Sequence, residues 1–353
     1  MWPLMARRRV LLPAFVCSVL ALRPLFFIGG SQASPRVPGR VARKAEFSTV
    51  AVPGATGRLG RLVVQELLKD TNLEVLALTR NVTRAEEILP VGERVKVVVW
   101  NASDDEAAAA KAFSNADVAV WCAEGQKSLV ALSKAFATRQ RRDSGAPRVV
   151  MCSSAAVTRP TWSQKQKSEL VGAADIPIVR LNPGGLLDEK RASEELLRKS
   201  GASYTVVRPT GLKDDWPNGR PVVSQGDVAV GRTSRQDLAS MLVRLLDEPS
   251  ATSKTFEVMT VPGYPKPREG YGQALDRLRP DATGPFSFVS RLRKWLGADE
   301  QAATYGVLQQ LLPGEEQDSA GLAMGQTYEQ YDKKEEGRLG PRGEERVPTF
   351  ASD

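Results

Sequence analysis

The sequence predicts an α/β protein built on a doubly wound parallel sheet, with a helical C-terminal extension. Short β-branched runs alternate with helical segments from residue 48 onward, and these runs are almost continuously apolar. A glycine-rich turn follows the first of them. Near-continuous apolar strands separated by helices are typical of a parallel sheet covered on both faces.

The expected elements follow in chain order. Strands are expected at 48–53, 73–79, 94–100, 117–122, 147–153, 203–207 and 254–259. Helices are expected at 58–69, 83–89, 104–113, 126–142, 188–200 and 235–247. They form one sheet domain over residues 46–260, which is a normal domain size. Residues 261–334 are expected to be an irregular connection followed by helices at 301–312 and 316–334, and the charged tail 335–353 is expected to be disordered.

The chain has 353 residues and no histidine, which excludes Ser-His-Asp triads, Cys-His nucleophile pairs and histidine-based metal sites. Its three cysteines are Cys17, Cys122 and Cys152, and their spacing suits neither a CxxC metal clip nor a disulfide framework. We therefore expect no metal site. Cys122 and Cys152 fall in predicted strands and are expected to be inert small hydrophobic residues.

The positive charge of the chain is confined to its first 45 residues. Lys plus Arg number 49 against 41 Asp plus Glu, a formal charge of +8, and eight basic residues without any acid precede Glu46. The other 41 basic residues balance the 41 acidic ones. A nucleic-acid partner, which requires a basic face, is therefore not expected.

Residues 1–45 have the pattern of a targeting leader. A basic segment at 7–9, an apolar run at 10–22 and small residues at 31–33 match a secretory signal, whereas 34–45 is Arg-rich and acid-free, as transit peptides are. This two-part pattern resembles the presequences that enter plastids of secondary origin, with secretory or mitochondrial targeting as alternatives. The apolar run is too short to predict a stable membrane span in the mature chain.

The glycine-rich turn carries the strongest functional signal. It has the order Gly54, Ala55, Thr56, Gly57, Arg58, Leu59, Gly60, between the first predicted strand and the first predicted helix. Glycines let a backbone turn tightly against a pyrophosphate, which also meets the unpaired N–H groups of the helix N-terminus. The turn therefore predicts dinucleotide binding; the alternative is a glycine-rich turn without a ligand.

The end of the second predicted strand indicates which dinucleotide is preferred. Sites that prefer NAD usually place an acidic residue there to bind the ribose hydroxyls. This chain has Thr79-Arg80, with no acid between Glu74 and Glu86. A 2′-phosphate would pair with Arg80 or with Arg58, so NADP(H) is predicted over NAD(H); the alternative is that both arginines are solvated surface residues.

These motifs resemble the atypical short-chain dehydrogenases/reductases, specifically the NAD(P)-binding NmrA-like proteins, and therefore a Rossmann fold. The resemblance spans residues 48–260 and is carried by GATGRLG (54–60), Ser153-Ser154, Lys190-x-x-x-Glu194, SGASYTVVRPTGL (200–212) and QGDVAVGRTSRQDLA (225–239). The stretches 176–187 and 311–321 look like those of plant and algal plastid members.

The resemblance implies roles for individual residues. The pyrophosphate would be held by Gly54, Thr56, Gly57, Arg58, Leu59 and Gly60, and Arg80 would meet the 2′-phosphate. Asn101 could bond adenine, Ala123 would lie near the ribose, and Lys190 would bind ribose hydroxyls. Ser153, Ser154, Pro209 and Thr210 would lie around the nicotinamide.

One departure matters for catalysis. Reductases of this superfamily use a Tyr four residues before the Lys, and here that residue is Leu186. Lys190 and Ser153 remain the catalytic candidates, Lys190 as a desolvated acid; its alternative is a surface pair with Glu194 at i+4. Asp214-Asp215 is read either as an acid/base pair or as a turn cap.

Two functions stay open at this point. The first is an NADP(H)-dependent oxidoreductase that acts on a small hydrophobic substrate. The alternative is a non-catalytic NADP(H)-dependent sensor or plastid assembly factor, in which a protein partner replaces the small-molecule substrate. The absent tyrosine favours the second, whereas the glycine-rich turn is equally compatible with both.

Overall fold

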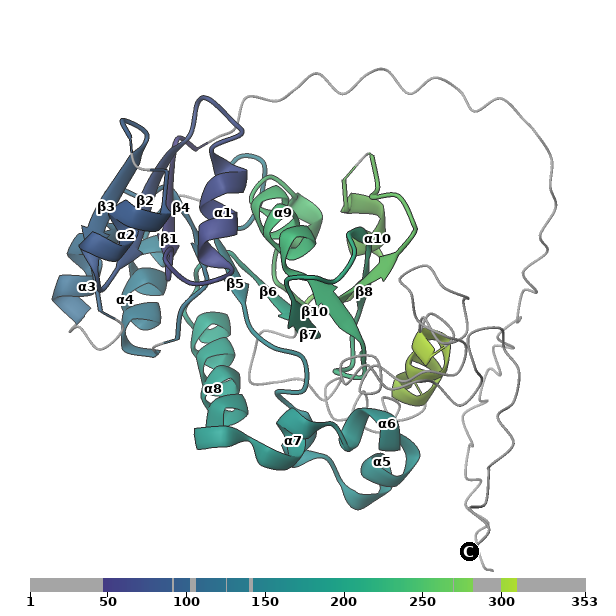
Figure 1. The fold of residues 1–353 in the computed structure, drawn as a ribbon. Helices are drawn as coiled ribbons and strands as arrows, with labels where there is room; N and C mark the ends of the chain where they lie inside the picture. The colour runs from purple at the N-terminus through teal and green to yellow at the C-terminus, as the bar shows by residue number, and fades with distance from the viewer. Residues whose placement is uncertain are drawn as a thin grey trace, which may run out of the picture. The chain divides into compact units, whose positions relative to one another are not determined.

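A computed structural model describes residues 47–90, 92–101, 106–124, 126–139, 142–268, 270–281 and 300–309. Its main feature is an eight-stranded sheet in the order β3-β2-β1-β4-β5-β6-β10-β8 (Figure 1). The strands are β1 (Thr49–Pro53), β2 (Glu74–Thr79), β3 (Val95–Val99), β4 (Val118–Trp121), β5 (Val149–Cys152), β6 (Tyr204–Pro209), β8 (Gly219–Ser224) and β10 (Lys254–Pro262). Neighbours pair in parallel from β3 to β10, which confirms the predicted fold class.

The sequence analysis did not predict three of the strands. The edge strand β8 pairs antiparallel with β10, and β7 (Gly211–Lys213) pairs with β9 (Arg232–Ser234) in a separate two-stranded sheet. β7 and β9 have three residues each, and β8 contains Gly219 and Pro221, residues that weaken a strand pattern. Pro221 is tolerated because β8 lies at the edge of the sheet.

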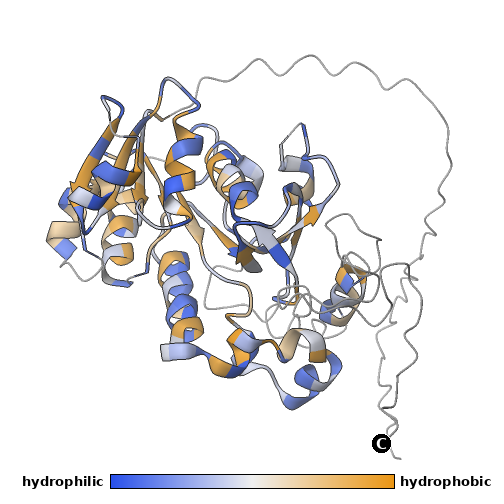
Figure 2. Ribbon diagram, viewed as in Figure 1, coloured by the Kyte–Doolittle hydropathy of each residue, from blue (hydrophilic) through white to orange (hydrophobic). Residues whose placement is uncertain are grey.

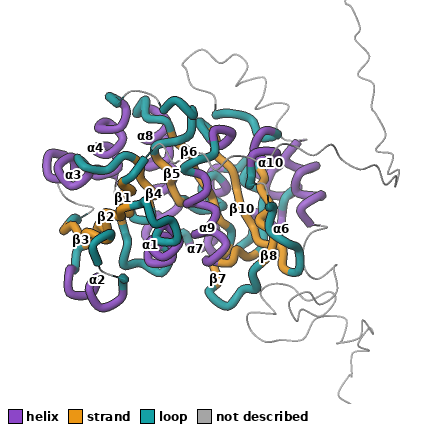
Figure 3. The backbone as a smooth tube through the Cα atoms, turned by 90° about the horizontal axis from the view of Figure 1, so that it is seen from above, coloured by secondary structure: helices purple, strands orange, loops and turns teal. Residues whose placement is uncertain are grey.

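Helices cover both faces of the sheet, as the doubly wound prediction requires. They are α1 (Gly60–Leu67), α2 (Val82–Ile88), α3 (Glu106–Phe113), α4 (Gln126–Ala137), α8 (Leu186–Lys199) and α9 (Arg235–Leu245). Viewed from above, α1 and α9 lie on one side of the row of strands and α3, α4 and α8 on the other (Figure 3). Each expected helix of this set is present within a few residues of its predicted bounds.

The core has two layers because successive strand residues point to opposite faces. Val50 and Val52 of β1 pack in the layer that contains α1 and α9, whereas Ala51 packs in the layer of α3, α4 and α8. Helix α1 buries Val63, Val64 and Leu67, the spacing of one helix face. The central strands are accordingly mostly hydrophobic in Figure 2, whereas the helices carry both hydrophobic and hydrophilic residues.

The stretch between β5 and α8 forms short helices. They are η1 (Arg159–Thr161), α5 (Gln164–Glu169), α6 (Val171–Ala174), α7 (Pro177–Leu181) and η2 (Pro183–Gly185), followed later in the chain by η3 (Pro249–Ala251) and α10 (Gly272–Asp276). A further helix covers residues 300–309, within one residue of the predicted start at 301. Leu308 of this helix is buried against Trp162 and Leu170, so the helix at 300–309 packs on this helical segment.

Several predictions lie outside the described residues: the leader 1–45, the helix at 316–334 and the tail 335–353. Within the described ranges, no helix is both long and apolar enough to cross a membrane.

Candidate cofactor site

The candidate site lies where the strand order reverses. β1 is flanked by β2 on one side and β4 on the other, so the chain leaves β1 in one direction and returns on the opposite side. In open α/β sheets, ligands bind outside the carboxyl ends of the strands at such a switch point. The segments that follow β1 and β4, residues 54–59 and 122–124, meet there.

The glycine-rich turn is a tight structure that side chains would disrupt. Gly54 has φ +80°, and a Cβ placed on it would lie 2.8 Å from the carbonyl oxygen of Cys122. A Cβ on Gly60 would collide with the Gly54 carbonyl oxygen, and one on Gly57 would lie 3.1 Å from the same atom. Gly54 and Gly60 are therefore required by close backbone approach to the end of β4 and within the turn, and a side chain at Gly57 would be crowded.

The turn leads into the N-terminus of α1, which carries features that suit an anion. Among the described residues no side chain caps Leu59, the N-cap position, and the first turn carries no acid. Thr56 shares a hydrogen bond of 3.1 Å with Thr79 at the end of β2. The N–H groups of Arg61 and Leu62 donate to the Gly57 and Leu59 carbonyl oxygens at 3.1 and 3.0 Å. The positive end of the helix dipole and the N–H groups that precede these two therefore suit a pyrophosphate.

Two arginines stand near this turn. Arg80 follows β2 and is exposed. Arg58 is 74% exposed and lies 3.7 Å from Asp214 Oδ2, whereas the nearly buried Arg235 forms the closer ion pair with the same carboxylate. The hydrogen bond from Arg235 is the main cause that holds the pKa of Asp214 below its usual value. Asp214 is thus an ion-pair partner, which favours a structural role over proton transfer.

Two further predicted residues follow β3 and β4. Asn101 is exposed, and its carbonyl oxygen accepts a hydrogen bond of 3.4 Å from Ser128. Ala123 is half-buried, with its Cα 3.3 Å from the Cβ that Gly54 lacks. The structure therefore brings Ala123 against the glycine-rich turn.

Lys190 lies at the carboxyl edge of the sheet and pairs with Glu124. Its Nζ donates to Glu124 Oε1 over 2.7 Å, and its side chain is 13% exposed. Its positive charge tends to lower the pKa values of Cys122 and Cys152. Burial is the larger effect, and it raises the pKa of both thiols. The alternative pair with Glu194 does not form, because Glu194 is held by other donors.

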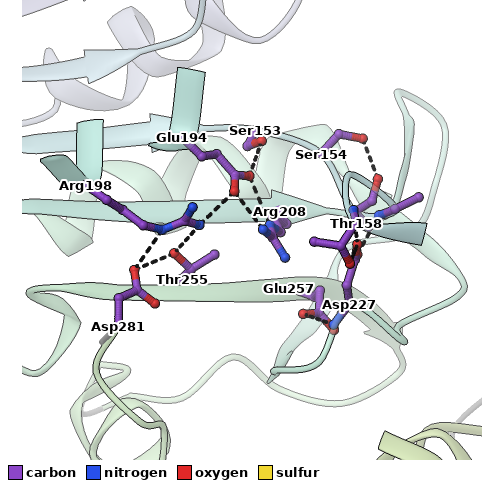
Figure 4. Close-up of polar contacts among 12 residues, drawn as sticks. Ser153, Ser154, Thr158, Glu194, Arg198, Arg208, Asp227, Thr255, Glu257 and Asp281 are labelled. Carbon is purple, nitrogen blue, oxygen red and sulfur yellow. Dashed lines mark hydrogen bonds and ion pairs between the residues drawn. The ribbon is translucent and has the colours of Figure 1, made fainter. Parts of the chain in front are cut away.

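Ser153, directly after β5, belongs to a buried polar cluster around Glu194 (Figure 4). Its hydroxyl donates to Glu194 Oε1 over 2.6 Å. Arg208 on β6 donates to both oxygens of Glu194, at 3.0 and 2.6 Å, and Arg198 donates to Oε2 at 2.7 Å. Although burial raises the pKa of Glu194, the two arginines and the Ser153 hydroxyl hold it below its usual value.

The cluster continues toward the C-terminal part of the domain. Arg198 also contacts Asp281 Oδ2 at 3.3 Å, and the same oxygen accepts from Thr255 at 2.7 Å and from the Tyr204 hydroxyl at 2.9 Å. Burial, followed by the Asp281 charge, raises the pKa of Tyr204. Tyr204 is therefore a structural hydrogen-bond donor at the start of β6.

A second buried cluster, which sequence reasoning missed, fixes the loop after β5 (Figure 4). The Asp227 carboxylate accepts from the backbone N–H of Ala156 at 2.6 Å and from the N–H and hydroxyl of Thr158 at 2.7 Å each. Arg159 is fully buried and donates to the carbonyl oxygen of Asp227 at 2.7 Å. Glu257 accepts from the Asp227 N–H at 2.8 Å. The signal available in the sequence was Asp227 within the motif at 225–239.

The remaining predicted residues line the ends of β5 and β6. Ser154 donates its hydroxyl to the Ala155 carbonyl at 2.8 Å, and the Ala155 N–H donates to the Pro209 carbonyl at 2.9 Å. Thr210 shares a hydrogen bond of 2.9 Å with Thr233. Both hydroxyl groups thus have hydrogen-bond partners within the protein. The described residues contain no group of three acidic or sulfur ligands that could hold a metal ion.

Comparison with known proteins agrees with this geometry. A family model described as NAD(P)H-binding matches residues 54–249. An uncharacterized chloroplastic protein of Arabidopsis thaliana is 28% identical over 242 residues, covering 65% of this chain and 82% of that protein. Quinone oxidoreductase 2 of Escherichia coli is 23% identical over 226 residues, covering 59% of this chain and 68% of that protein.

A solved structure shows the same fold. An oxidoreductase of Lactococcus lactis superposes with a TM-score of 0.52 at 16% identity, covering 66% of this chain and 100% of that one. The family match covers more than half of the chain and begins at Gly54, the first glycine of the turn. The chain belongs to the NAD(P)H-binding family, which confirms its resemblance to the NmrA-like, atypical short-chain dehydrogenases/reductases.

Proposed function

We propose that this protein binds NADP(H) at the β1/β4 switch point and passes a hydride to a small hydrophobic substrate. The observation that carries the cofactor preference is the end of β2, where exposed Arg80 stands and no carboxylate follows before Glu86. A charge-assisted hydrogen bond to a 2′-phosphate contributes about 1.5–3 kcal/mol, roughly a ten- to a hundred-fold preference.

Titration of the full chain with NADPH and NADH tests this preference. The wild type should bind NADPH at least about ten-fold more tightly. Arg80→Ala should weaken NADPH binding and leave NADH binding unchanged. Arg84→Ala, which removes another exposed arginine one turn along α2, is the matched control and should change neither. An equal loss of both cofactors in Arg80→Ala would show that Arg80 does not recognise the phosphate.

The position and contacts of Lys190 support a role for this residue in holding the cofactor. Its ammonium group lies at the carboxyl edge of the sheet and pairs with Glu124, which is itself 53% exposed. Ribose hydroxyls are suitable acceptors for an ammonium group. We infer that Lys190 exchanges Glu124 for the nicotinamide ribose when the dinucleotide binds.

The substrate class follows from the missing proton donor. Bound NADPH supplies a hydride, and reduction of a simple ketone then leaves an alkoxide that needs a strong local acid. An alkoxide is about as strong a base as hydroxide, whose conjugate acid, water, has a pKa of about 15.7. Reduction of a quinone leaves a phenolate instead, which is a much weaker base because a phenol has a pKa of about 10. Solvent can therefore protonate the quinone product, so a site without the family's tyrosine is better suited to a quinone. The similarity to a relative that is named as a quinone oxidoreductase supports the same class.

A turnover assay tests the substrate class. The full chain is mixed with NADPH and either simple quinones or simple ketones, and the loss of the near-ultraviolet absorbance of NADPH is followed. Quinone-dependent oxidation without ketone-dependent oxidation is expected. Turnover of ketones at comparable rates would show that an unrecognised proton donor exists.

A second candidate function is a non-catalytic NADP(H)-dependent sensor or assembly factor. Ser153 favours it, because its hydroxyl is committed to Glu194 rather than free for a substrate carbonyl. The turnover assay separates the two functions. NADPH binding without turnover on either panel would support the sensor.

We also propose that the protein acts in a plastid. The two-part leader and the similarity to a chloroplastic plant protein support this location. Residues 1–45 fused to a fluorescent protein should reach the plastid of an alga whose plastid is of secondary origin. Delivery to the cell exterior or to mitochondria would contradict the proposal.

A further inference from the structure

Ser153 has only one proton to donate, and the structure shows where it goes. The hydroxyl oxygen lies 2.6 Å from Glu194 Oε1, and Ser153 and Glu194 are both buried. This distance is typical of a hydroxyl that donates to an ionised carboxylate. Because an ionised carboxylate only accepts hydrogen bonds, the proton of this pair must come from Ser153.

Glu194 cannot accept a further hydrogen bond. It already accepts one hydrogen bond from Ser153, two from Arg208 and one from Arg198. A carboxylate has about four acceptor sites, so these four donors fill it. Two guanidinium groups stabilise its negative charge, so Glu194 is not a relay that could return a proton to Ser153.

Turning the Ser153 hydroxyl toward a ligand would carry a cost. It would leave the buried Oε1 of Glu194 without one of its donors, and the loss of a buried partner costs about as much as an ordinary hydrogen bond provides. The free lone pairs of the Ser153 oxygen have no such conflict. Ser153 is therefore preorganised to accept a hydrogen bond.

Ser153 also stands where the nicotinamide half of a dinucleotide would lie. It follows β5 directly, next to β4 in the sheet, and the Lys190 charge acts on the preceding residue, Cys152. The one strong hydrogen-bond donor on the nicotinamide ring is the NH₂ of its carboxamide.

We propose that Ser153 accepts a hydrogen bond from the carboxamide NH₂ of the nicotinamide and does not donate to a substrate carbonyl. This inference rests on the proposed cofactor site. It assigns Ser153 to recognition of the cofactor, reverses the hydrogen-bond direction that a carbonyl-binding serine would need, and makes Glu194 the positioning residue that sets this direction.

The test compares two ligands that differ in the donor alone. NADP⁺ carries the carboxamide, and its 3-acetylpyridine analogue replaces the NH₂ with a methyl group; the oxidised forms are used so that no hydride moves. Binding to the full chain is measured by calorimetry. The wild type should prefer NADP⁺ by about five-fold, the factor for one hydrogen bond of ordinary strength.

Ser153→Ala should bind both ligands equally. Ser193→Ala is the matched control, because Ser193 is equally buried on α8, next to Glu194, and its hydroxyl donates to the Glu189 carbonyl. This control should retain the five-fold preference. If Ser153→Ala does not fold, Ser153→Cys replaces it, since a thiol can still face Glu194 but is a weak acceptor, and the preference should again disappear.

The outcomes separate this inference from the proposed function. If the wild type binds neither ligand, the cofactor site itself is wrong, and the role of Ser153 falls with it. If the wild type binds both ligands without preference, or if the alanine and cysteine variants keep the preference, the cofactor site stands and the role of Ser153 is overturned.

Discussion

Replacing Glu194 with glutamine removes one buried negative charge while keeping the shape of the side chain. Glu194 is fully buried, and Arg208, which donates to both of its oxygens, is only 9% exposed at its side chain. After the substitution the buried Arg208 guanidinium would lose its ion-paired carboxylate and keep only the weaker electrostatic interactions with Asp227 and Glu257. Ser153 would lose its ionised acceptor as well.

The expected loss of stability is large for a single polar substitution. Removing one partner of a buried ion pair costs about 3–5 kcal/mol, because it leaves an uncompensated buried charge. Arg198 is about a quarter exposed and keeps Asp281 as a second partner, and the glutamine carbonyl still accepts one hydrogen bond. We therefore expect about 3 kcal/mol, the lower end of that range.

Urea unfolding followed by tryptophan fluorescence measures this loss, since Trp100 and Trp121 are buried in the core. With a typical urea dependence of about 3 kcal/mol per molar, the midpoint should fall by about 1 M. Glu195→Gln is the control on the same helix. Its partner Lys199 is 79% exposed and 3.9 Å away, so less than about 0.5 kcal/mol is expected.

The pH dependence provides a second check. The pKa of Glu194 is lowered in the folded state, so its contribution is complete above the unfolded pKa of about 4.3 and is lost as the pH falls through the folded pKa. The stability difference between wild type and Glu194→Gln should be constant from pH 6 to 8 and shrink below about pH 4. A midpoint for Glu194→Gln equal to that of Glu195→Gln at pH 7 would refute the reasoning.

Three further predictions follow from the same contacts. Gly60→Ala should abolish NADPH binding in titrations, because its Cβ would collide with a carbonyl oxygen of the turn, whereas Gly92→Ala, with nothing within 4 Å, should bind normally; equal binding by both variants would contradict the tight turn. Glu124→Gln should strengthen NADPH binding, since it frees the Lys190 ammonium group, and weaker binding would mean that Glu124 itself helps to hold the cofactor. Burial raises the pKa of Cys152 to about 11, so the Cys152 thiol should resist alkylation in the native protein at pH 8 and react after denaturation. Mass spectrometry of the peptide that contains Cys152 measures both reactions.

The sequence by itself determined the strand and helix order and the cofactor turn. Apolar β-branched runs and helical periodicity are local patterns, and they predicted the parallel strands from β1 to β10 within a few residues. Gly54 and Gly60 could be identified in the sequence because the backbone at each position lies so close to another carbonyl group that only glycine fits. β7 and β9 have only three residues each, and Gly219 and Pro221 interrupt the strand pattern of β8, so these three strands were missed.

Only the tertiary structure decided what the polar side chains at the site do. Lys190 pairs with Glu124, 66 residues away, and Ser153 donates to Glu194, 41 residues away, so no spacing rule within one helix could find these partners. Glu194 itself looked like the i+4 partner of Lys190. It turns instead toward Arg208 and Ser153, because a buried carboxylate is stable only where several donors converge, and the folded sheet brings those donors together.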